Sequence, residues 1–180
     1  MTLYRVVCAD PPWQHNDQLP GPARGASSHY STMSAAEIRS FRVPMCDDDA
    51  LLFLWRVASM VEEAYSVVRA WHFEPKSEIV WEKVTKTGKA HFGMGHIVRA
   101  SHETCIVATR GRYSSLIKSR SIRSRFSAAV PTNESGRAIH SAKPEFFYTN
   151  IVQELVPGPY VELFARRQRL GWTCLGKQAA

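Results

Sequence analysis

The feature that most constrains the fold of this chain is a short apolar run, Val6 to Ala9, that ends in the tetrapeptide Asp10-Pro11-Pro12-Trp13. The run has the length of a buried β-strand and contains β-branched valines, so we predict a strand over residues 4–9. Two successive prolines stop this strand, because proline has no N–H to donate and its φ is fixed. Asp10 therefore lies where the strand ends, and in open α/β sheets ligands bind at the carboxyl ends of the strands.

The same tetrapeptide has the chemistry needed to hold a planar amine. An ionised carboxylate such as that of Asp10 only accepts hydrogen bonds, and the carbonyl groups of Pro11 and Pro12 are held in fixed directions. Acceptors that hold both N–H groups of an exocyclic amine favour a pyramidal nitrogen whose lone pair faces an electrophile. The Trp13 ring offers a surface on which a base can stack. The alternative is structural, with Asp10 capping a turn and Trp13 packing into the core.

The composition is that of a globular protein with a polyanionic partner. The chain has 180 residues, of which 44% are hydrophobic and 22% are charged, and we expect one domain over residues 1–180. A net charge of +7 favours nucleic acid as a partner. No apolar run approaches the length of a membrane span, and the N-terminus lacks the layout of a signal peptide. We therefore expect a soluble, intracellular, cytoplasmic protein that binds no membrane.

The cysteines and histidines favour neither disulfides nor a metal. The cysteines are far apart and form no C-x-x-C pair, so we interpret them as buried free thiols: Cys8, Cys46, Cys105 and Cys174. His96 and the pair His102-Glu103 lack the H-E-x-x-H spacing of a zinc site. We expect no metal.

Blocks of apolar periodicity predict a regular succession of strands and helices. A capping-box pattern at Ser34 and Glu37 opens a short helix up to about Arg39, and an amphipathic pattern predicts a helix over residues 59–71. We interpret the three aspartates at 47–49 as a solvated turn. Further strands are predicted over residues 50–55, 77–81, 104–109, 160–165 and 171–176. Because strands and helices alternate, we predict an α/β fold with a doubly wound sheet.

The remaining segments are one helix and two long loops. Pro144 lies in the first turn of a predicted helix whose apolar face includes Phe147 and Ile151 and which stops before Pro157. Residues 14–24 are predicted to form a mobile loop over the first site. Residues 82–101 form a long basic loop with three glycines, and such loops in compact domains are usually functional or disordered.

No acidic residue occurs between Thr104 and Asn133, a stretch that is rich in arginine and serine. Its cations are Arg110, Arg112, Lys118, Arg120, Arg123 and Arg125. One interpretation is a solvated, partly disordered segment. We favour contact with a nucleic-acid backbone, because charge of one sign alternates with hydroxyl donors.

Read with four later blocks, the tetrapeptide resembles the DPPW-type adenine N6-methyltransferases, the family of the catalytic subunit of the eukaryotic messenger-RNA adenosine methyltransferase. The chain looks like a small prokaryotic or phage-like member. The later blocks are His29-Tyr30-Ser31-Thr32-Met33, Leu52-Phe53-Leu54-Trp55, Ser141-Ala142-Lys143-Pro144 and Val161-Glu162-Leu163-Phe164-Ala165-Arg166, with Gly171-Trp172 near the end. The resemblance extends from about residue 6 to residue 176.

The resemblance implies a Rossmann-like class I methyltransferase fold, with a mostly parallel sheet, helices on both faces and the catalytic motif before the main cofactor-binding strand. It also implies S-adenosylmethionine as the cofactor, Lys143 beside the reacting centre, and Glu162 with Arg166 on the cofactor's ribose and flank. The predicted catalytic residues are Asp10, Pro11, Pro12, Trp13 and Lys143. The predicted cofactor-binding residues are Glu162, Arg166, Gln168 and Gln178. The predicted substrate-binding residues are Tyr30, Trp55, Lys83, His102, Arg120, Arg123 and Arg125.

Some positions depart from the family's pattern. The proline that often follows Arg166 is replaced by Arg167, and the asparagine often found after Gly176 is replaced by Lys177. The segment that precedes the catalytic strand in larger members is missing from this sequence, so we expect the adenine pocket either to be built by other residues or to be incomplete. Glu162 in mid-strand needs a partner, because a buried carboxylate is costly. That partner is either a pair of ribose hydroxyls or a nearby arginine.

These features predict an S-adenosylmethionine-dependent methyltransferase that modifies the N6 amine of adenine in nucleic acid, with DNA favoured because the chain is compact. A single-stranded substrate would avoid most of the cost of flipping a base out of a duplex. The alternatives are an RNA N6-adenosine methyltransferase and a non-catalytic, nucleic-acid-binding subunit of a methyltransferase complex. A homodimer or a partner subunit also remains open.

Overall fold

In the computed structural model, residues 2–14, 32–93, 97–139 and 142–176 are described. Seven strands form one sheet in the order β5-β3-β4-β2-β1-β6-β7. The strands are β1 (Tyr4–Ala9), β2 (Cys46–Arg56), β3 (Glu74–Val84), β4 (His102–Arg110), β5 (Arg125–Ala129), β6 (Tyr160–Leu163) and β7 (Trp172–Leu175). Strand β4 is antiparallel to β2 and β3, and the other neighbours pair in parallel. The predicted mostly parallel α/β sheet is confirmed.

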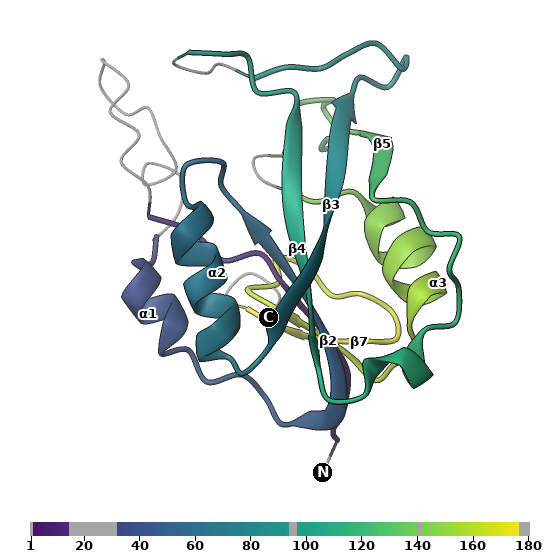
Figure 1. Cartoon of the computed structure of the whole chain (residues 1–180). Coiled ribbons are helices and arrows are strands. Elements are labelled where there is room, and N and C mark those ends of the chain that lie inside the picture. Colours follow the sequence, from purple (N-terminus) through teal and green to yellow (C-terminus); the bar gives the residue numbers. More distant parts are fainter. Residues whose placement is uncertain (1, 15–31, 94–96, 140–141, 177–180) are drawn as a thin grey trace.

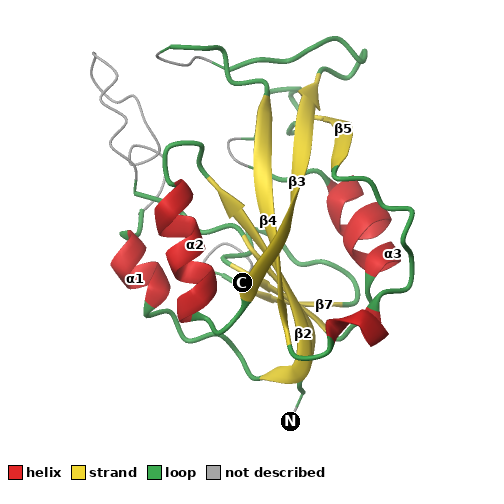
Figure 2. Cartoon of the chain, viewed as in Figure 1, coloured by secondary structure: helices red, strands yellow, loops and turns green. Residues whose placement is uncertain are grey.

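Helices cover both faces of the sheet (Figures 1 and 2). On one face lie α1 (Ala35–Arg39) and α2 (Val61–Ala70), and on the other lies a helical segment made of η3 (Phe147–Val152) and α3 (Gln153–Leu155). A short helix, η2 (Tyr113–Leu116), follows β4. Two clusters of buried residues result: one contains Ile38, Val67 and Val68 from α1 and α2, and the other contains Phe147 and Ile151 from η3. This two-layer cover is that of a Rossmann-like domain.

Local signals in the sequence predict several elements well. Strand β1 has the predicted bounds, and the capping box between Ser34 and Glu37 is formed, with the Ser34 side chain accepting from the Glu37 N–H. The four cysteines are free thiols. Cys8 and Cys105 are buried as predicted, whereas Cys46 and Cys174 are only partly buried. Among the described residues, no helix has the length and apolar character needed to span a membrane.

One prediction about local structure is wrong. The aspartates at 47–49 belong to β2 rather than to a solvated turn, because Cys46 pairs with Tyr4 of β1 and Asp47 accepts a hydrogen bond from Arg5 at 3.1 Å. The basic stretch after β4 contains η2 and the strand β5, which pairs in parallel with β3. Phe126 of β5 is buried in the core. Phe126, together with partly buried neighbours such as Tyr113 and Leu116, anchors a segment that otherwise has the composition of a loop.

The helix predicted after Pro144 is present but irregular. It starts at Glu145, and its middle, η3, is a π-helix before the chain returns to α-helix in α3. A π-turn carries one extra residue per turn and is often found at functional sites. Here Phe147, Tyr148, Ile151 and Val152 of η3 are all buried against the sheet.

Candidate active site

The candidate site lies at the carboxyl end of the central strands. Strand β1 lies between β2 and β6 and is parallel to both, so the chain segments that leave these three strands meet at the same end of the sheet. Asp10 directly follows β1. The connection between β3 and β4 emerges at this end as well, because Glu82 near the end of β3 pairs with His102 at the start of β4.

The two prolines form a short, hydrogen-bonded turn. The Pro11 carbonyl accepts from the Trp13 N–H at 2.9 Å, and the Pro12 carbonyl accepts from the Met33 N–H at 2.7 Å. Trp13 and Met33 also form an isolated β-bridge. The turn is therefore fixed by the backbone, and each carbonyl oxygen keeps a second lone pair that can accept from a ligand.

Lys143 connects Asp10 to a second carboxylate. Its Nζ lies 2.7 Å from Asp10 Oδ2 and 3.2 Å from Glu103 Oε2, and its side chain is only 4% exposed. Glu103 also accepts from Lys83, with 2.6 Å between Lys83 Nζ and Glu103 Oε1. Two carboxylates and two ammonium groups thus form a chain Asp10–Lys143–Glu103–Lys83 in which the charges balance, as buried ions require.

The pKa values of this chain reflect burial and pairing. Burial raises the pKa of Asp10, and the ammonium of Lys143 opposes that rise. Burial alone would also raise the pKa of Glu103, but Lys143 and Lys83 outweigh it and lower that pKa to about 2. For Lys143, burial would lower the pKa, and the carboxylates of Asp10 and Glu103 raise it instead. Lys143 therefore stays protonated and is a cation that holds Asp10 rather than a general base.

The ring of Trp55 faces Lys143, whereas Trp13 packs in the other buried cluster. The Lys143 Nζ lies 5.3 Å from the ring centroid of Trp55, a cation–π distance. The Trp13 indole N–H donates to the Trp55 carbonyl at 2.9 Å, and the Trp13 ring is only 4% exposed. Trp13 thus occupies the core position that the structural alternative gave it. Stacking of a base on Trp13 or Trp55 stays a prediction.

A second buried cluster surrounds Glu162 in the middle of β6. Glu162 Oε1 accepts from the Tyr148 hydroxyl at 2.7 Å, and Oε2 accepts from Arg169 Nη2 at 3.4 Å. Burial raises the pKa of Glu162, while Tyr148 and Arg169 oppose that rise. The arginine that the sequence left open as a partner for Glu162 is therefore Arg169.

The other predicted residues differ in exposure, and some of them fall outside the described residues. Arg166 is half-buried and close enough to Asp10 for its charge to lower the pKa of that carboxyl, whereas Gln168 is exposed in the turn after β6. His102 is exposed beside Glu103. Arg120 and Arg123 are exposed between η2 and β5, and Arg125 in β5 lies 3.5 Å from Glu82. Tyr30, Gln178, His96 and most of the predicted loop over the site fall outside the described residues.

Sequence reasoning missed Glu103, Tyr148 and Arg169 as members of the site. Glu103 had one signal, since it is an acid at the start of an otherwise apolar strand. Tyr148 lies on the buried face of η3, where its hydroxyl needs a partner. The sequence does not distinguish Arg169 from the nearby Arg167. Only the tertiary structure shows that the Arg169 side chain is buried, at 7% exposed.

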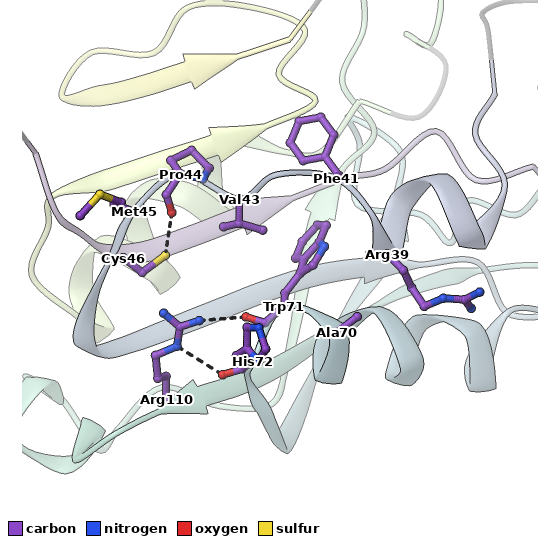
Figure 3. A pocket seen from close by; sticks show the side chains of 10 residues that line it. All are labelled: Arg39, Phe41, Val43, Pro44, Met45, Cys46, Ala70, Trp71, His72 and Arg110. Carbon is purple, nitrogen blue, oxygen red and sulfur yellow. Dashed lines mark hydrogen bonds between the residues drawn. The ribbon is translucent and has the colours of Figure 1, made fainter.

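The structure also contains a cavity of about 350 Å³ at the opposite end of the sheet (Figure 3). It is lined by Arg39, Phe41, Val43, Pro44, Met45, Cys46, Ala70, Trp71, His72 and Arg110. Cys46 is the first residue of β2 and Arg110 the last of antiparallel β4, so the cavity lies away from Asp10. Arg110 donates to the carbonyls of Trp71 and His72 at 3.0 and 3.2 Å. These hydrogen bonds pair two backbone acceptors that follow the C-terminal end of α2. This cavity is not part of the candidate site.

Comparison with known proteins places the chain among methyltransferases. The profile of the MT-A70 family matches residues 4–178. The N(6)-adenosine-methyltransferase MT-A70-like protein of Drosophila melanogaster is 30% identical over 97% of this chain and 27% of its own length. The N(6)-adenosine-methyltransferase catalytic subunit METTL3 of Homo sapiens is 28% identical over 97% of this chain and 28% of its own length. The type II methyltransferase M.MunI of Mycoplasma sp is 25% identical over 94% of this chain and 75% of its own length. The chain thus spans about a quarter of the first two relatives.

Proposed function

This chain belongs to the MT-A70 family, and we propose that it transfers a methyl group from S-adenosylmethionine to the N6 amine of adenine in nucleic acid. The observation that carries this proposal is the position of Asp10. Its carboxylate lies at the carboxyl end of the central strand, directly before the proline turn, and is bound by the buried Lys143. This arrangement places a carboxylate acceptor next to the hydrogen-bonded proline turn, where it can hold the N–H groups of an amine.

The residues around Asp10 fit this cofactor, which supplies a methyl group bonded to a positively charged sulfur. Asp10 provides negative charge at the site, and Arg166 and Arg169 provide donors from the turn that follows β6. The Nε of Arg169 is buried and has no hydrogen-bond partner among the residues that the structure describes. Such a donor is costly to leave unpaired and fits a ligand oxygen.

The chain's own groups have clear tasks in the transfer. Asp10 and the Pro11 carbonyl accept the two N–H groups of the adenine amine and turn the nitrogen lone pair toward the methyl group. The new N–C bond forms as the S–C bond breaks, and the bonding pair stays on sulfur. The nitrogen then loses one proton to Asp10 or to water. The ion pair between Lys143 Nζ and Asp10 Oδ2, 2.7 Å apart, favours the ionised form of Asp10 before that step.

We propose DNA ahead of RNA as the polymer. The type II methyltransferase M.MunI, of which this chain covers 75%, supports this order, whereas the chain covers 27% and 28% of the two animal relatives. RNA remains the second candidate, since the animal relatives are N(6)-adenosine-methyltransferases. The net charge of +7 supports either polyanion.

The decisive experiment measures transfer of labelled methyl groups to matched adenine-containing DNA and RNA oligonucleotides, both single- and double-stranded. We expect label on DNA, and we expect Asp10→Ala to lower the rate at least about a hundredfold while cofactor affinity changes little, because Asp10 acts mainly on the amine. Asp48→Ala, a change of an exposed acid in β2, is the matched control and should retain full activity.

The outcomes separate the rival functions. Label on RNA alone would assign the second candidate. Cofactor binding without label on any polymer would contradict the proposed activity of this chain and support a nucleic-acid-binding subunit. An Asp10→Ala protein that fails to fold would show that Asp10 is structural.

A further inference from the structure

Phe146 is an exposed aromatic residue in the first turn of the helix that follows Lys143. It is 44% exposed, although the next two residues, Phe147 and Tyr148, are buried against the sheet. Its ring stacks on that of Phe126 in β5, with 5.6 Å between the centroids and 23° between the planes. Phe126 in turn stacks on Phe147, 6.2 Å away. The exposed part of the Phe146 ring is therefore held in a fixed orientation by the core.

This ring lies close to the candidate active site. Phe146 follows Lys143 by three residues, so their Cα atoms are at most about 11 Å apart. The two residues also share one side of the sheet, because Lys143 lies over Trp55, which belongs to the same buried cluster as Phe126. Lys143 contacts Asp10 directly. An adenine held at Asp10 would thus have its neighbouring nucleotides within reach of the Phe146 ring.

A basic segment runs from Phe146 along the same helix. The chain between η2 and β5 passes beside α3 (Figure 1), where Lys118 donates to the Gln153 carbonyl at 2.7 Å. It reaches the start of the helix at Phe126, which contacts Phe146. Two exposed arginines lie between these contacts. They are Arg120 and Arg123.

The acids beside Phe146 are paired with cations. Glu145, the preceding residue, contacts both arginines of the turn after β6. Glu82 of β3 lies 3.5 Å from Arg125, at the start of β5. Each of these carboxylates is therefore balanced by a positive charge, and neither makes the surface around Phe146 repel a polyanion.

The polar surroundings favour a base rather than an apolar protein surface as the partner of Phe146. The exposed residues that follow it on the helix are Thr149 and Asn150, so apolar surface does not continue along the helix. A ring beside exposed cations is typical of sites for single-stranded nucleic acid, in which the cations contact the backbone and the ring stacks on a base.

We propose that Phe146 stacks on the unpaired base next to the target adenine and that Arg123 contacts a phosphate of the same strand. This inference rests on the proposed function, because it assumes that adenine in nucleic acid is bound at Asp10. A base that is stacked on Phe146 cannot also stack on the target adenine. The contact therefore favours a single-stranded substrate, or an adenine that has left its duplex.

The first test locates the contact by photocrosslinking, without methyl transfer. The probe is single-stranded DNA with one adenine among thymines, in which 5-iodouracil replaces one thymine at a time, and RNA of the same sequence is the second arm. Mass spectrometry identifies the crosslinked residue. We expect crosslinks to Phe146 from the position next to the adenine and not from distant positions. Crosslinks that never include Phe146, or that reach it equally from every position, would overturn the inference.

The second test measures affinity for the same strands by fluorescence anisotropy. We expect Phe146→Ala and Phe146→Leu each to weaken binding about tenfold, whereas Phe146→Tyr keeps the ring and should bind within about twofold of the wild type. The slope of log K against log salt should stay unchanged in all three, because a stack neutralises no phosphate. The midpoint of thermal unfolding identifies any variant that is weakened by loss of packing on Phe126.

Leu3→Ala is the matched control for the loss of exposed apolar surface. Leu3 is also 44% exposed, and it precedes β1 at the end of the strand away from Asp10. This variant should bind both strands as the wild type does.

The outcomes separate this inference from the proposed function. Wild-type affinity in Phe146→Leu would overturn the inference, and methyl transfer by the same protein would leave the proposed function intact. Binding that depends on the Phe146 ring, without methyl transfer to any polymer, would support the stacking contact and contradict the proposed activity. A wild-type chain that binds neither strand would overturn both.

Discussion

At the scale of single residues, Glu103 decides the charge state of the candidate site. It lies between Lys143 and Lys83, 3.2 and 2.6 Å from their Nζ atoms. Without Glu103, Lys143 would have Asp10 alone as its carboxylate within salt-bridge distance among the described residues, and Lys83 would have none. The buried ammonium of Lys143 would then depend on Asp10 alone for its ion pair. The proposed reaction, however, needs the same carboxylate to bind the amine.

The pKa of Glu103 predicts a specific acid sensitivity. In the folded state it falls to about 2 from an ordinary value of 4.5, so the pairing stabilises the fold above pH 4.5 and this contribution is lost as the pH falls toward 2. The shift corresponds to roughly 3 kcal/mol. Denaturant unfolding between pH 2 and pH 7 should show Glu103→Gln less stable than the wild type at neutral pH, with the two curves converging near pH 2.

Glu62→Gln, a change at an exposed position of α2, serves as the control and should follow the wild-type curve. Parallel curves for wild type and Glu103→Gln across the whole range would contradict the role given to Glu103. Above neutral pH, the raised pKa of Lys143 acts with the opposite sign: its contribution is present below its ordinary value of 10.5 and is lost as the pH rises through the higher folded value.

At the scale of elements, the basic stretch that follows β4 and includes β5 combines a packed frame with exposed cations. The frame is η2 and β5, which pack through Tyr113, Leu116 and Phe126. Arg120 and Arg123 are exposed in the segment between them. Arg125 is 70% exposed at 3.5 Å from Glu82, and such an exposed pair adds little to stability. These cations are therefore available to a polyanion.

Replacing Arg120, Arg123 and Arg125 together by alanine should weaken nucleic-acid binding without unfolding the protein. Each phosphate contact that is lost should reduce the slope of log K against log salt by about 0.9 for a duplex. Fluorescence anisotropy at several salt concentrations measures this slope. Alanine at Arg39, Arg42 and Arg69, three exposed arginines around α1 and α2, is the charge-matched control. An equal loss of slope in both triple variants would mean that only net charge matters and would contradict a specific contact.

At the scale of the whole molecule, the ligand-binding end joins parts of the chain that are far apart in sequence. Asp10 and Lys143 are separated by 133 residues and Tyr148 and Glu162 by 14, yet both pairs meet beside β1 and β6. A ligand bound between these strands stabilises the folded state as a whole, because the unfolded chain has no such site.

S-adenosylhomocysteine at a hundred times its Kd should therefore add about 2.7 kcal/mol to the free energy of unfolding. For a domain of this size the midpoint of thermal unfolding should rise by roughly 5–10 °C. Scanning calorimetry measures the shift, and adenosine monophosphate at the same concentration is the control ligand. Equal shifts with both ligands would indicate a general nucleotide site instead of a cofactor site.

What the sequence determined by itself is local. The apolar run that ends at two prolines specifies β1 and the position of Asp10, and the capping box specifies α1, because strand length, turn chemistry and capping are decided by neighbouring residues. The resemblance to a known family added Lys143 and the turn after β6. These are the parts in which short-range chemistry leaves few alternatives.

Only the tertiary structure decided which side chains that are distant in sequence come into contact in the buried site. Glu103, Tyr148 and Arg169 acquire their roles from the order of the strands, which brings β4, η3 and the end of β6 beside Asp10. The strand β5 and the first residues of β2 likewise depend on partners across the sheet. The physical reason is that desolvation makes a buried charge depend on its partner, and the partner is chosen by the packing of the whole sheet rather than by the residues next to it.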